Sequence, residues 1–256
     1  MPRRVVVTGS SSGIGRSLAQ SLRADGAEVV GVDLAGAEID ADLATEDGRS
    51  AVVDAVGDLG GLDALVTCAG TSNPSALMVR LNYFGSVLLA DRLRPLLAAS
   101  SSPRVALVGS ISGTQPTDAG LVDACLADDE AAGVDRADEL VRAGDPHRIY
   151  PSTKSALAQW VRRTAVAPGW ADAGIALNVV APGVVLTPMS AGLVDDPRMR
   201  AVMDAAVPMP LGGYAPPEAV ARVLAFLVSP ETTHLTGQVL YVDGGAEVTL
   251  RPADRF

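Results

Sequence analysis

Residues 4–15 read RVVVTGSSSGIG and join a short apolar stretch to a turn rich in glycine and serine. Beyond the turn, Ile14, Leu18, Ala19 and Leu22 recur at helical spacing, so a helix should follow. Glycines let a backbone approach a pyrophosphate closely, and free N–H groups at a helix start attract phosphate charge. Glycines also occur in turns that bind nothing, but a turn between strand and helix favours a nucleotide site. The expected phosphate-binding residues are Gly9, Ser12, Gly13, Ile14 and Gly15.

Apolar strands and amphipathic helices alternate from this segment to the end of the chain. The first strand is predicted at residues 4–8, and further strands at residues 27–32, 62–69, 104–108, 175–180 and 238–242. Helices are predicted at residues 81–97, 150–167 and 218–227. This alternation predicts an α/β fold of the Rossmann type, with a doubly wound parallel sheet, as one domain over residues 1–256.

Composition limits the classes of partner. The chain has 256 residues and a net charge of −10, which argues against binding nucleic acid or an anionic membrane through a broad basic surface. Cys68 and Cys125 form no disulfide framework, and His147 and His234 lie far apart, so no metal site is expected. Only four residues precede the apolar run that starts at Val5, too few for a signal peptide, and no later apolar run is long enough to span a bilayer, so we expect a cytoplasmic protein.

Two segments depart from the regular alternation. Residues 33–42 are too few for a strand–helix–strand crossover, so a peripheral helix should be missing. Residues 112–148 are polar, but Leu121, Cys125 and Leu140 suggest one or two short amphipathic helices. This second segment is either a solvated surface insertion or a functional one, which covers an active site or alters a subunit contact.

Asp33 stands at the end of the second predicted strand. A carboxylate there can accept hydrogen bonds from both ribose hydroxyls of NAD and would repel the 2′-phosphate of NADP. Leu34 and Ala35 follow it, so no arginine is placed to receive a phosphate. The alternative is a solvated turn aspartate, but the pattern favours NAD as the cofactor.

Tyr150 and Lys154 are four residues apart and therefore share one helix face. An ammonium beside a phenol favours the phenolate, so such a pair can exchange a proton with an alcohol while hydride moves to a nicotinamide. A tyrosine and a lysine at this spacing are common by chance. Here, however, Lys154 is the only lysine among 20 basic residues, and arginine presents different donors.

Other motifs occur in a fixed order along the chain: Asp42-Leu43, Cys68-Ala69-Gly70, Asn82, Ser110 and Pro182-Gly183. With the glycine-rich turn and the Tyr150–Lys154 pair, they make the chain resemble the short-chain dehydrogenase/reductases, in their compact branch, from end to end. The resemblance implies that Tyr150 is the general acid/base, and that Lys154 lowers its pKa and binds the nicotinamide ribose. It also implies that Ser110 hydrogen-bonds the substrate oxygen and that Asn82 holds a water in a proton relay.

The resemblance also implies the cofactor contacts. Val185 and Thr187 should contact the carboxamide end of NAD. The other implied contacts, besides the glycine-rich turn, Asp33, Tyr150 and Lys154, are Asp42, Leu43, Ala69, Gly70, Pro182 and Gly183.

The chain differs from the family pattern in informative places. Cys68 stands where an asparagine is usual, and we expect it to be structural. Ser110 precedes Tyr150 by 40 residues instead of about a dozen, so residues 112–148 are an insertion. The short 33–42 link, this insertion, Asn82-Tyr83-Phe84-Gly85 and the tail at 251–256 resemble the bacterial 3α-hydroxysteroid dehydrogenase/carbonyl reductase subgroup. Dehydrogenases of the coniferyl-alcohol type are neighbours of that subgroup.

The segment at 188–217 should bind the substrate, and it holds four of the six methionines. Flexible thioethers suit an adaptable apolar site, although a helix packed on the core would look similar. No arginine is clearly placed to bind a carboxylate or phosphate of a substrate, although Arg198 and Arg200 could reach inward. We expect a bulky, apolar, uncharged alcohol or ketone: a 3-hydroxy/3-oxo steroid or similar carbonyl, or alternatively an aryl or terpenoid alcohol.

Three other functions are less well supported. An inactive nucleotide-binding protein should lack part of the Ser110–Tyr150–Lys154 set, which is complete here. A dehydratase or epimerase of the family should have a longer C-terminal domain. An enoyl reductase should have a different spacing between its tyrosine and its lysine.

We expect a homodimer. In the compact branch the helices at 81–97 and 150–167 usually pair across a two-fold axis, and the insertion should obstruct that contact. A dimer through the surface near residues 218–242 is then expected, and a tetramer is the alternative.

Overall fold

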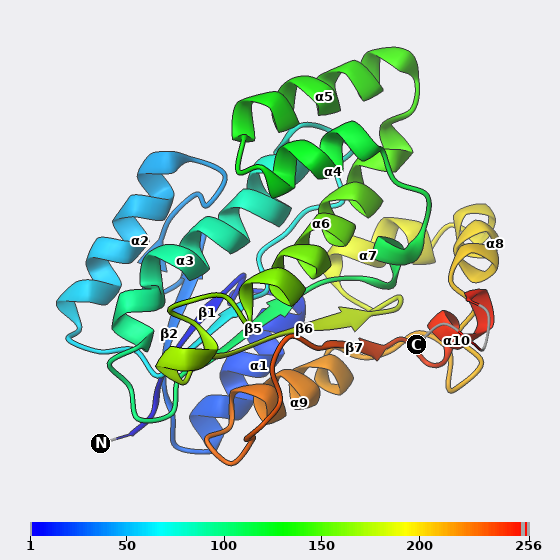
Figure 1. Ribbon diagram of the computed structural model, residues 1–256. Coiled ribbons are helices and arrows are strands. Elements are labelled where there is room, and N and C mark those ends of the chain that lie inside the picture. Colours follow the sequence, from blue (N-terminus) through cyan, green and yellow to red (C-terminus); the bar gives the residue numbers. More distant parts are fainter. Residues whose placement is uncertain (1, 252–253, 255–256) are drawn as a thin grey trace.

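The centre of the molecule is a parallel sheet of seven strands in the order β3-β2-β1-β4-β5-β6-β7 (Figure 1). It is seen in a computed structural model that describes residues 2–251 and 254. The strands are β1 (Arg4–Thr8), β2 (Glu28–Asp33), β3 (Ile39–Asp40), β4 (Ala64–Thr67), β5 (Arg104–Val108), β6 (Ala176–Pro182) and β7 (Val239–Val242). The predicted doubly wound α/β fold is therefore confirmed.

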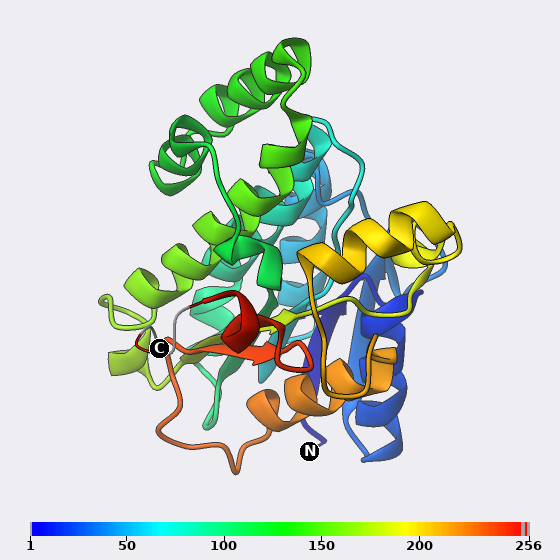
Figure 2. The same cartoon turned by 90° about the vertical axis from the view of Figure 1, so that its right-hand side faces the viewer.

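Helices cover both faces of this sheet (Figures 1 and 2). On one face α1 (Gly13–Ala24) packs against α9 (Pro217–Val228), and the other face carries α2 (Glu46–Asp58), α3 (Gly85–Leu97) and α6 (Ile149–Thr164). Strand β1 shows why both faces need cover. Val5 and Val7 belong to the apolar cluster under α1 and α9, and Val6 belongs to the cluster on the opposite side.

Short helices connect these layers. They are the π-helix η1 (Val79–Phe84), the 3₁₀ helices η2 (Ile111–Thr114), η3 (Pro146–Arg148) and η4 (Ala171–Ala173), and the α-helices α7 (Pro188–Val194), α8 (Pro197–Ala206) and α10 (Ala246–Leu250). The helix predicted at 81–97 thus begins two residues earlier, with a π-helical stretch that contains Asn82. The catalytic helix predicted at 150–167 runs from Ile149 to Thr164.

The insertion folds into α4 (Ala119–Leu126) and α5 (Glu130–Ala143), so its predicted helical nature is confirmed. Helix α4 packs on α6, and α5 packs on α4 and η1. Leu121, Cys125 and Leu140 are buried in the main apolar cluster. Both views show the pair standing outside α3 and α6, on the side away from α9 (Figures 1 and 2). The insertion therefore extends the core, and its two helices form no cover over the sheet edge.

Between β2 and β3, residues 34–38 form a turn without a helix, as the short 33–42 link predicts. Val32 and Asp33 pair in parallel with Ile39 and Asp40. Within the described part of the chain, no helix has the length and apolarity to cross a bilayer. Of the C-terminal tail at 251–256, residues 252–253 and 255–256 lie outside the described residues.

Candidate active site

A cavity of about 660 Å³ opens at the carboxyl ends of β1, β2, β4, β5 and β6. In a parallel sheet these strand ends meet at one edge, where ligands usually bind. Every site residue predicted from the sequence lines this one cavity, from Gly9 in the first turn to Thr187 after β6. Residues far apart in the chain are thereby brought together, and the following paragraphs build the site from its nucleotide end to its substrate end.

The glycine-rich turn can be built only with glycine at two places. Gly9 has a φ of +67°, and a Cβ atom there would lie 2.8 Å from the backbone nitrogen of Ala69. A Cβ on Gly15 would lie 2.2 Å from the carbonyl oxygen of Gly9. Helix α1 then begins at Gly13, and its N-cap residue Ser12 makes no side-chain cap hydrogen bond. The turn therefore leaves a bare backbone and a helix start facing the cavity, which fits a pyrophosphate.

Asp33 lies over this turn at the end of β2. Its two carboxylate oxygens accept hydrogen bonds from the backbone nitrogens of Ser11, at 2.9 Å, and Leu34, at 2.8 Å. Asp42 and the buried Leu43 line the same end of the cavity. Among the described residues lining the cavity there is no arginine, so no guanidinium is placed here for a phosphate.

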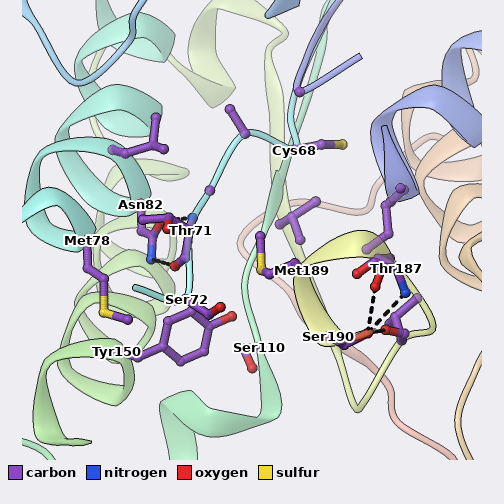
Figure 3. A pocket seen from close by; sticks show the side chains of 18 of the residues that line it. Cys68, Thr71, Ser72, Met78, Asn82, Ser110, Tyr150, Thr187, Met189 and Ser190 are labelled. Carbon is purple, nitrogen blue, oxygen red and sulfur yellow. Dashed lines mark hydrogen bonds between the residues drawn. The ribbon is translucent and has the colours of Figure 1, made fainter. Parts of the chain in front are cut away.

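Tyr150 and Lys154 project from α6 toward β5. The Lys154 ammonium is 5.7 Å from the centre of the Tyr150 ring and donates a hydrogen bond to the Val108 carbonyl at 2.8 Å. Ser110, which follows β5, accepts a hydrogen bond from the Ser112 backbone nitrogen at 3.1 Å. Figure 3 shows the Tyr150 and Ser110 side chains directed into the same space. A substrate oxygen between these hydroxyls would meet a proton carrier and a hydrogen-bond donor together.

Burial dominates the electrostatics of this pair. It lowers the pKa of Lys154 to about 8, because an ammonium is poorly solvated there. It also raises the pKa of Tyr150, although the hydrogen bond with Ser110 opposes that change. The pKa of Tyr150 therefore shifts in the direction opposite to the one that the Tyr–Lys pair alone predicts, because the loss of water outweighs the hydrogen bond with Ser110. The Lys154 ammonium is directed to the Val108 carbonyl instead.

Asn82 is fully buried in η1, and its side-chain amide forms hydrogen bonds with the backbone of Thr71. Its Oδ1 accepts from the Thr71 nitrogen at 2.8 Å, and its Nδ2 donates to the Thr71 carbonyl at 2.9 Å (Figure 3). The side chain thereby fixes the wall that continues from β4. Its implied part in a proton relay stays a prediction.

Cys68 begins the same wall. The Thr8 Oγ1 atom accepts hydrogen bonds from the backbone nitrogens of Cys68 and Ala69, both at 3.1 Å. Burial raises the pKa of the Cys68 thiol to about 12, so the thiol stays protonated at neutral pH. A protonated thiol is a poor nucleophile, which agrees with a structural part for Cys68.

The wall opposite Tyr150 is made by the segment after β6. A Cβ on Gly183 would lie 2.9 Å from the Cα of Asp243 and 2.8 Å from the Met209 sulfur, and because the first of these atoms is backbone, glycine is needed for this close packing. The Ser190 hydroxyl accepts from the Thr187 nitrogen at 3.0 Å and donates to the Val185 carbonyl at 2.5 Å (Figure 3). These bonds hold Val185 and Thr187 at the start of α7, where both face the cavity.

The substrate end of the cavity is apolar. Met189, Met203 and Val207 line it, whereas Met199 is not part of the lining and Met209 packs on Gly183 instead. Only part of the methionine cluster therefore serves the site. Arg198 and Arg200 do not line the cavity, and the Arg200 guanidinium lies 5.4 Å from the Tyr214 ring centre, so neither reaches inward.

Several lining residues were not predicted from the sequence. They lie in the segment between β4 and η1 or in η1, η2 and η3: Thr71, Ser72, Pro74, Leu77, Met78, Leu81, Ile111, Ser112, Pro146 and His147. For Thr71, Ser72, Ile111 and Ser112, a position shortly after a strand end was the available signal, and the other residues had none. Among the described residues no group of His, Cys, Asp and Glu could hold a metal ion.

Comparison with known proteins gives consistent matches. Residues 3–122 match the family described as short chain dehydrogenase, and residues 137–247 match the family described as Enoyl-(Acyl carrier protein) reductase. The gap between the two matches falls in the insertion.

A 3-alpha-hydroxysteroid dehydrogenase/carbonyl reductase of Comamonas testosteroni is 33% identical, over 97% of this chain and 98% of the relative. A cis-4-hydroxycyclohexanecarboxylate dehydrogenase of Sinomonas cyclohexanicum is 31% identical, over 95% and 96%. The crystal structure of a 3-alpha-hydroxysteroid dehydrogenase from Pseudomonas sp. B-0831, complexed with NADH, superposes with a TM-score of 0.90. It is 41% identical and covers 99% of this chain and 100% of that one.

Proposed function

Because the chain belongs to the short-chain dehydrogenase/reductase family, we propose that it is an NAD-dependent oxidoreductase that interconverts a secondary alcohol and a ketone. One observation carries this proposal. The hydroxyls of Tyr150 and Ser110 and the ammonium of Lys154 lie in the same cavity as the glycine-rich turn. A dinucleotide lying from that turn toward Thr187 would end beside Tyr150.

The proposed chemistry uses these side chains in turn. During oxidation the Ser110 hydroxyl hydrogen-bonds the alcohol oxygen, and the Tyr150 phenolate oxygen takes the alcohol proton. Bound NAD supplies the acceptor for the hydride that leaves the carbinol carbon. The C–O bond becomes a carbonyl as the proton and hydride depart, and reduction runs the same steps backward. Lys154 binds the nicotinamide ribose and adds positive charge near the phenolate.

The choice of NAD over NADP follows from Asp33. A carboxylate at the end of the second strand of such a fold repels a 2′-phosphate, and no arginine lies among the described residues that line the cavity. The relative from Pseudomonas sp. B-0831 was crystallised with NADH, which supports the same choice for this chain.

A bulky, apolar substrate fits the far end of the cavity. Among the described residues, no Asp, Glu or Arg side chain lines the substrate end. Besides Tyr150, Lys154 and the Cys68 thiol, its titratable side chain is that of His147, which is exposed. We propose a 3-hydroxy/3-oxo steroid or a similar carbonyl, which the names of two relatives support. An aryl or terpenoid alcohol is the second candidate, because it would fill the same apolar walls. We further propose a cytoplasmic homodimer.

A substrate panel with NAD tests the proposal. Hydroxysteroids, aryl alcohols, terpenols and cyclohexanols are compared by kcat/KM, from the absorbance of reduced cofactor. We expect a hydroxysteroid to rank first. A protein that binds NAD but oxidises no alcohol and reduces no ketone in the panel would be a nucleotide-binding protein without this activity.

A further inference from the structure

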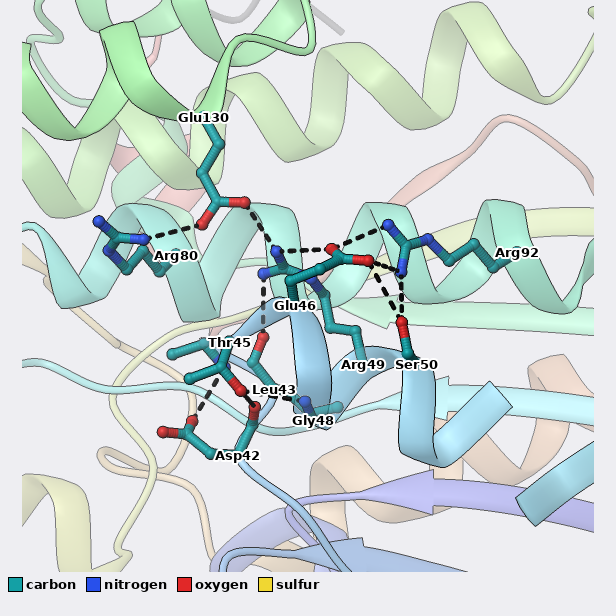
Figure 4. Close-up of polar contacts among 11 residues, drawn as sticks. Asp42, Leu43, Thr45, Glu46, Gly48, Arg49, Ser50, Arg80, Arg92 and Glu130 are labelled. Atoms are coloured by element: carbon teal, nitrogen blue, oxygen red, sulfur yellow. Dashed lines mark hydrogen bonds and ion pairs between the residues drawn. The ribbon is translucent and has the colours of Figure 1, made fainter. Parts of the chain in front are cut away.

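Arg49 is a buried cation between the insertion and the nucleotide end of the cavity. It lies on α2 and is 2% exposed. Its Nη2 donates to Glu130 Oε2 at 2.8 Å and to Glu46 Oε2 at 3.3 Å, and its Nη1 donates to the Leu43 carbonyl at 3.3 Å (Figure 4). Its Nε has no hydrogen-bond partner. One guanidinium thus joins α5 of the insertion to the turn after β3.

Glu130 is the main counter-charge of this guanidinium. A buried cation is costly unless it is paired, so the quality of the pair matters. Glu46 has a side chain that is 58% exposed, and its carboxylate is engaged at 2.6 and 2.9 Å by Arg92. Glu130 is 22% exposed and makes the shorter contact with Arg49, while Arg80 holds its second oxygen at 3.4 Å. Without the Glu130 charge, the carboxylate left beside Arg49 would be that of Glu46, which is exposed to solvent and already bound by Arg92.

Leu43 is the other end of this connection. Its side chain is 4% exposed and lines the cavity beside Asp42, at the end where the resemblance places cofactor contacts. A Cβ on Gly85 would lie 3.0 Å from the Leu43 carbonyl, and one on Gly48 would lie 2.0 Å from the Asp42 carbonyl. The turn is therefore packed tightly between α2 and α3, and its Leu43 carbonyl is also bound by Arg49.

We propose that Glu130, through Arg49, is a positioning residue for the adenine half of the cofactor. The carboxylate holds the guanidinium, the guanidinium holds the Leu43 carbonyl, and Leu43 with Asp42 forms the wall against which the adenine lies. This inference rests on the proposed function, because it takes the cavity to bind a dinucleotide. It gives the insertion a part in cofactor binding at the end remote from Tyr150.

The insertion provides a matched control. Glu139 lies on the same helix α5, and its exposed carboxylate pairs with Arg136 at 2.7 Å. Arg136 is also bound to Asp118 at 2.8 Å, so this cluster ties α5 to the start of α4 and does not contact Leu43. Glu139→Gln removes one carboxylate and one ion pair from the insertion but leaves the Arg49 connection intact.

Binding of the two halves of the cofactor tests the proposal. Dissociation constants for NAD, ADP-ribose and nicotinamide mononucleotide are measured on the full chain for the wild type, Glu130→Gln, Glu130→Asp and Glu139→Gln, after circular dichroism has shown each to be folded. We expect Glu130→Gln to weaken NAD and ADP-ribose about tenfold and to leave nicotinamide mononucleotide within twofold. Glu130→Asp should restore most of the affinity because it keeps the charge, and Glu139→Gln should match the wild type.

Two results would overturn the inference while leaving the proposed function intact. One is unchanged ADP-ribose binding by Glu130→Gln. The other is an equal loss for both halves, or for Glu139→Gln, which would indicate general loosening of the insertion. If the wild type bound neither NAD nor ADP-ribose, the proposed function itself would fail, and the inference with it.

Discussion

The charged Lys154 side chain is almost completely shielded from water. It is 6% exposed, and burial lowers its pKa to about 8. The Val108 carbonyl is the group that it contacts by a hydrogen bond. Arginine would bring more donors into this small space, all needing acceptors, and it cannot lower its charge by losing a proton. The single lysine of the chain therefore stands where its particular chemistry is needed.

The pKa of this lysine can be observed directly, because no other lysine contributes a signal. Protein labelled with carbon-13 at the lysine ε-carbon should give one cross-peak, and its titration should report a pKa of about 8, as burial dictates. A denatured sample serves as the control and should titrate near ~10.4. A midpoint near 10 in the folded protein would show that water reaches the ammonium and that the depression is absent.

Burial of this charge should also reduce the stability of the fold. The folded pKa lies below the unfolded one, so the cost is fully present below pH 8 and disappears as the pH rises toward 10.5. Lys154→Met should therefore stabilise the fold at pH 7, by up to roughly 3 kcal/mol at about 1.4 kcal/mol per pKa unit. Urea unfolding at pH 7 and pH 10 measures the effect. If the gain in the free energy of unfolding did not shrink at pH 10, improved packing and not the loss of a buried charge would be its cause.

Asp33 is expected to set the cofactor preference. Asp33→Ala removes the carboxylate that would repel a 2′-phosphate, so the ratio of kcat/KM for NAD to that for NADP should fall at least about tenfold. Asp40→Ala is the matched control, because Asp40 ends β3 close by and does not line the cavity. A wild-type enzyme that preferred NADP would contradict the assignment of Asp33.

At the scale of elements, the sequence predicts strands better than helices here. The buried strands are short apolar runs with clear ends, and β1 and β5 match their predicted bounds. Helix α2 was not predicted, because it contains Gly48 and Gly57 and buries few side chains. Strand β3 has two residues and owes its existence to pairing with β2, which no local pattern reveals. The π-helix η1, which holds Asn82 against the Thr71 backbone, was likewise not predicted.

The insertion shows a similar limit. Its apolar spacing predicts helices, but only the structure shows that α4 packs on α6 and leaves the cavity uncovered. Of its residues, Ser112, Pro146 and His147 reach the cavity lining. The contacts of Glu130 with Arg49 join positions 81 residues apart, and two charged residues at such a separation carry no signal in a single sequence.

The placement of α4 bears on assembly. Helix α4 packs on α6, and packed helix axes are only ~8–10 Å apart, so we expect α4 to obstruct close pairing of a second chain with that helix. The surface around α9 keeps an exposed apolar side chain, Phe226, and lies on the opposite side of the molecule. Light scattering should therefore give a dimer, twice the chain mass of 26.1 kDa.

Two variants separate this dimer from other assemblies. Phe226→Asp should shift the mass toward the monomer, and Leu59→Asp, at an exposed apolar position after α2, should not. A wild-type tetramer that persists in Phe226→Asp would show that the insertion does not prevent the contact through α3 and α6.

At the scale of the whole molecule, the fold brings separate parts of the sequence to one sheet edge. The carboxyl ends of β1 and β2 provide the nucleotide end, and those of β4, β5 and β6 provide the reaction end. The order of these motifs could be predicted from the sequence. The apolar substrate walls could be predicted only in part, because the 188–217 segment provides Met189, Met203 and Val207 as expected. Met78 and Ile111 come from other elements, whose meeting with that segment depends on the packing of the whole chain. Tyr150 stands where the two ends meet, and the account depends on its chemistry.

Transfer of deuterium from an alcohol to the cofactor tests that chemistry most directly. The best alcohol of the panel, deuterated at its carbinol carbon, is incubated with NAD, and the reduced nicotinamide is analysed by mass spectrometry. The wild type and Tyr241→Phe, which loses a hydroxyl outside the cavity, should both deliver the deuterium to the cofactor. Tyr150→Phe should bind NAD nearly as well but transfer deuterium at least ~100-fold more slowly, because the proton carrier is lost. Transfer by Tyr150→Phe within tenfold of the wild-type rate, or loss of the deuterium to solvent, would contradict the account.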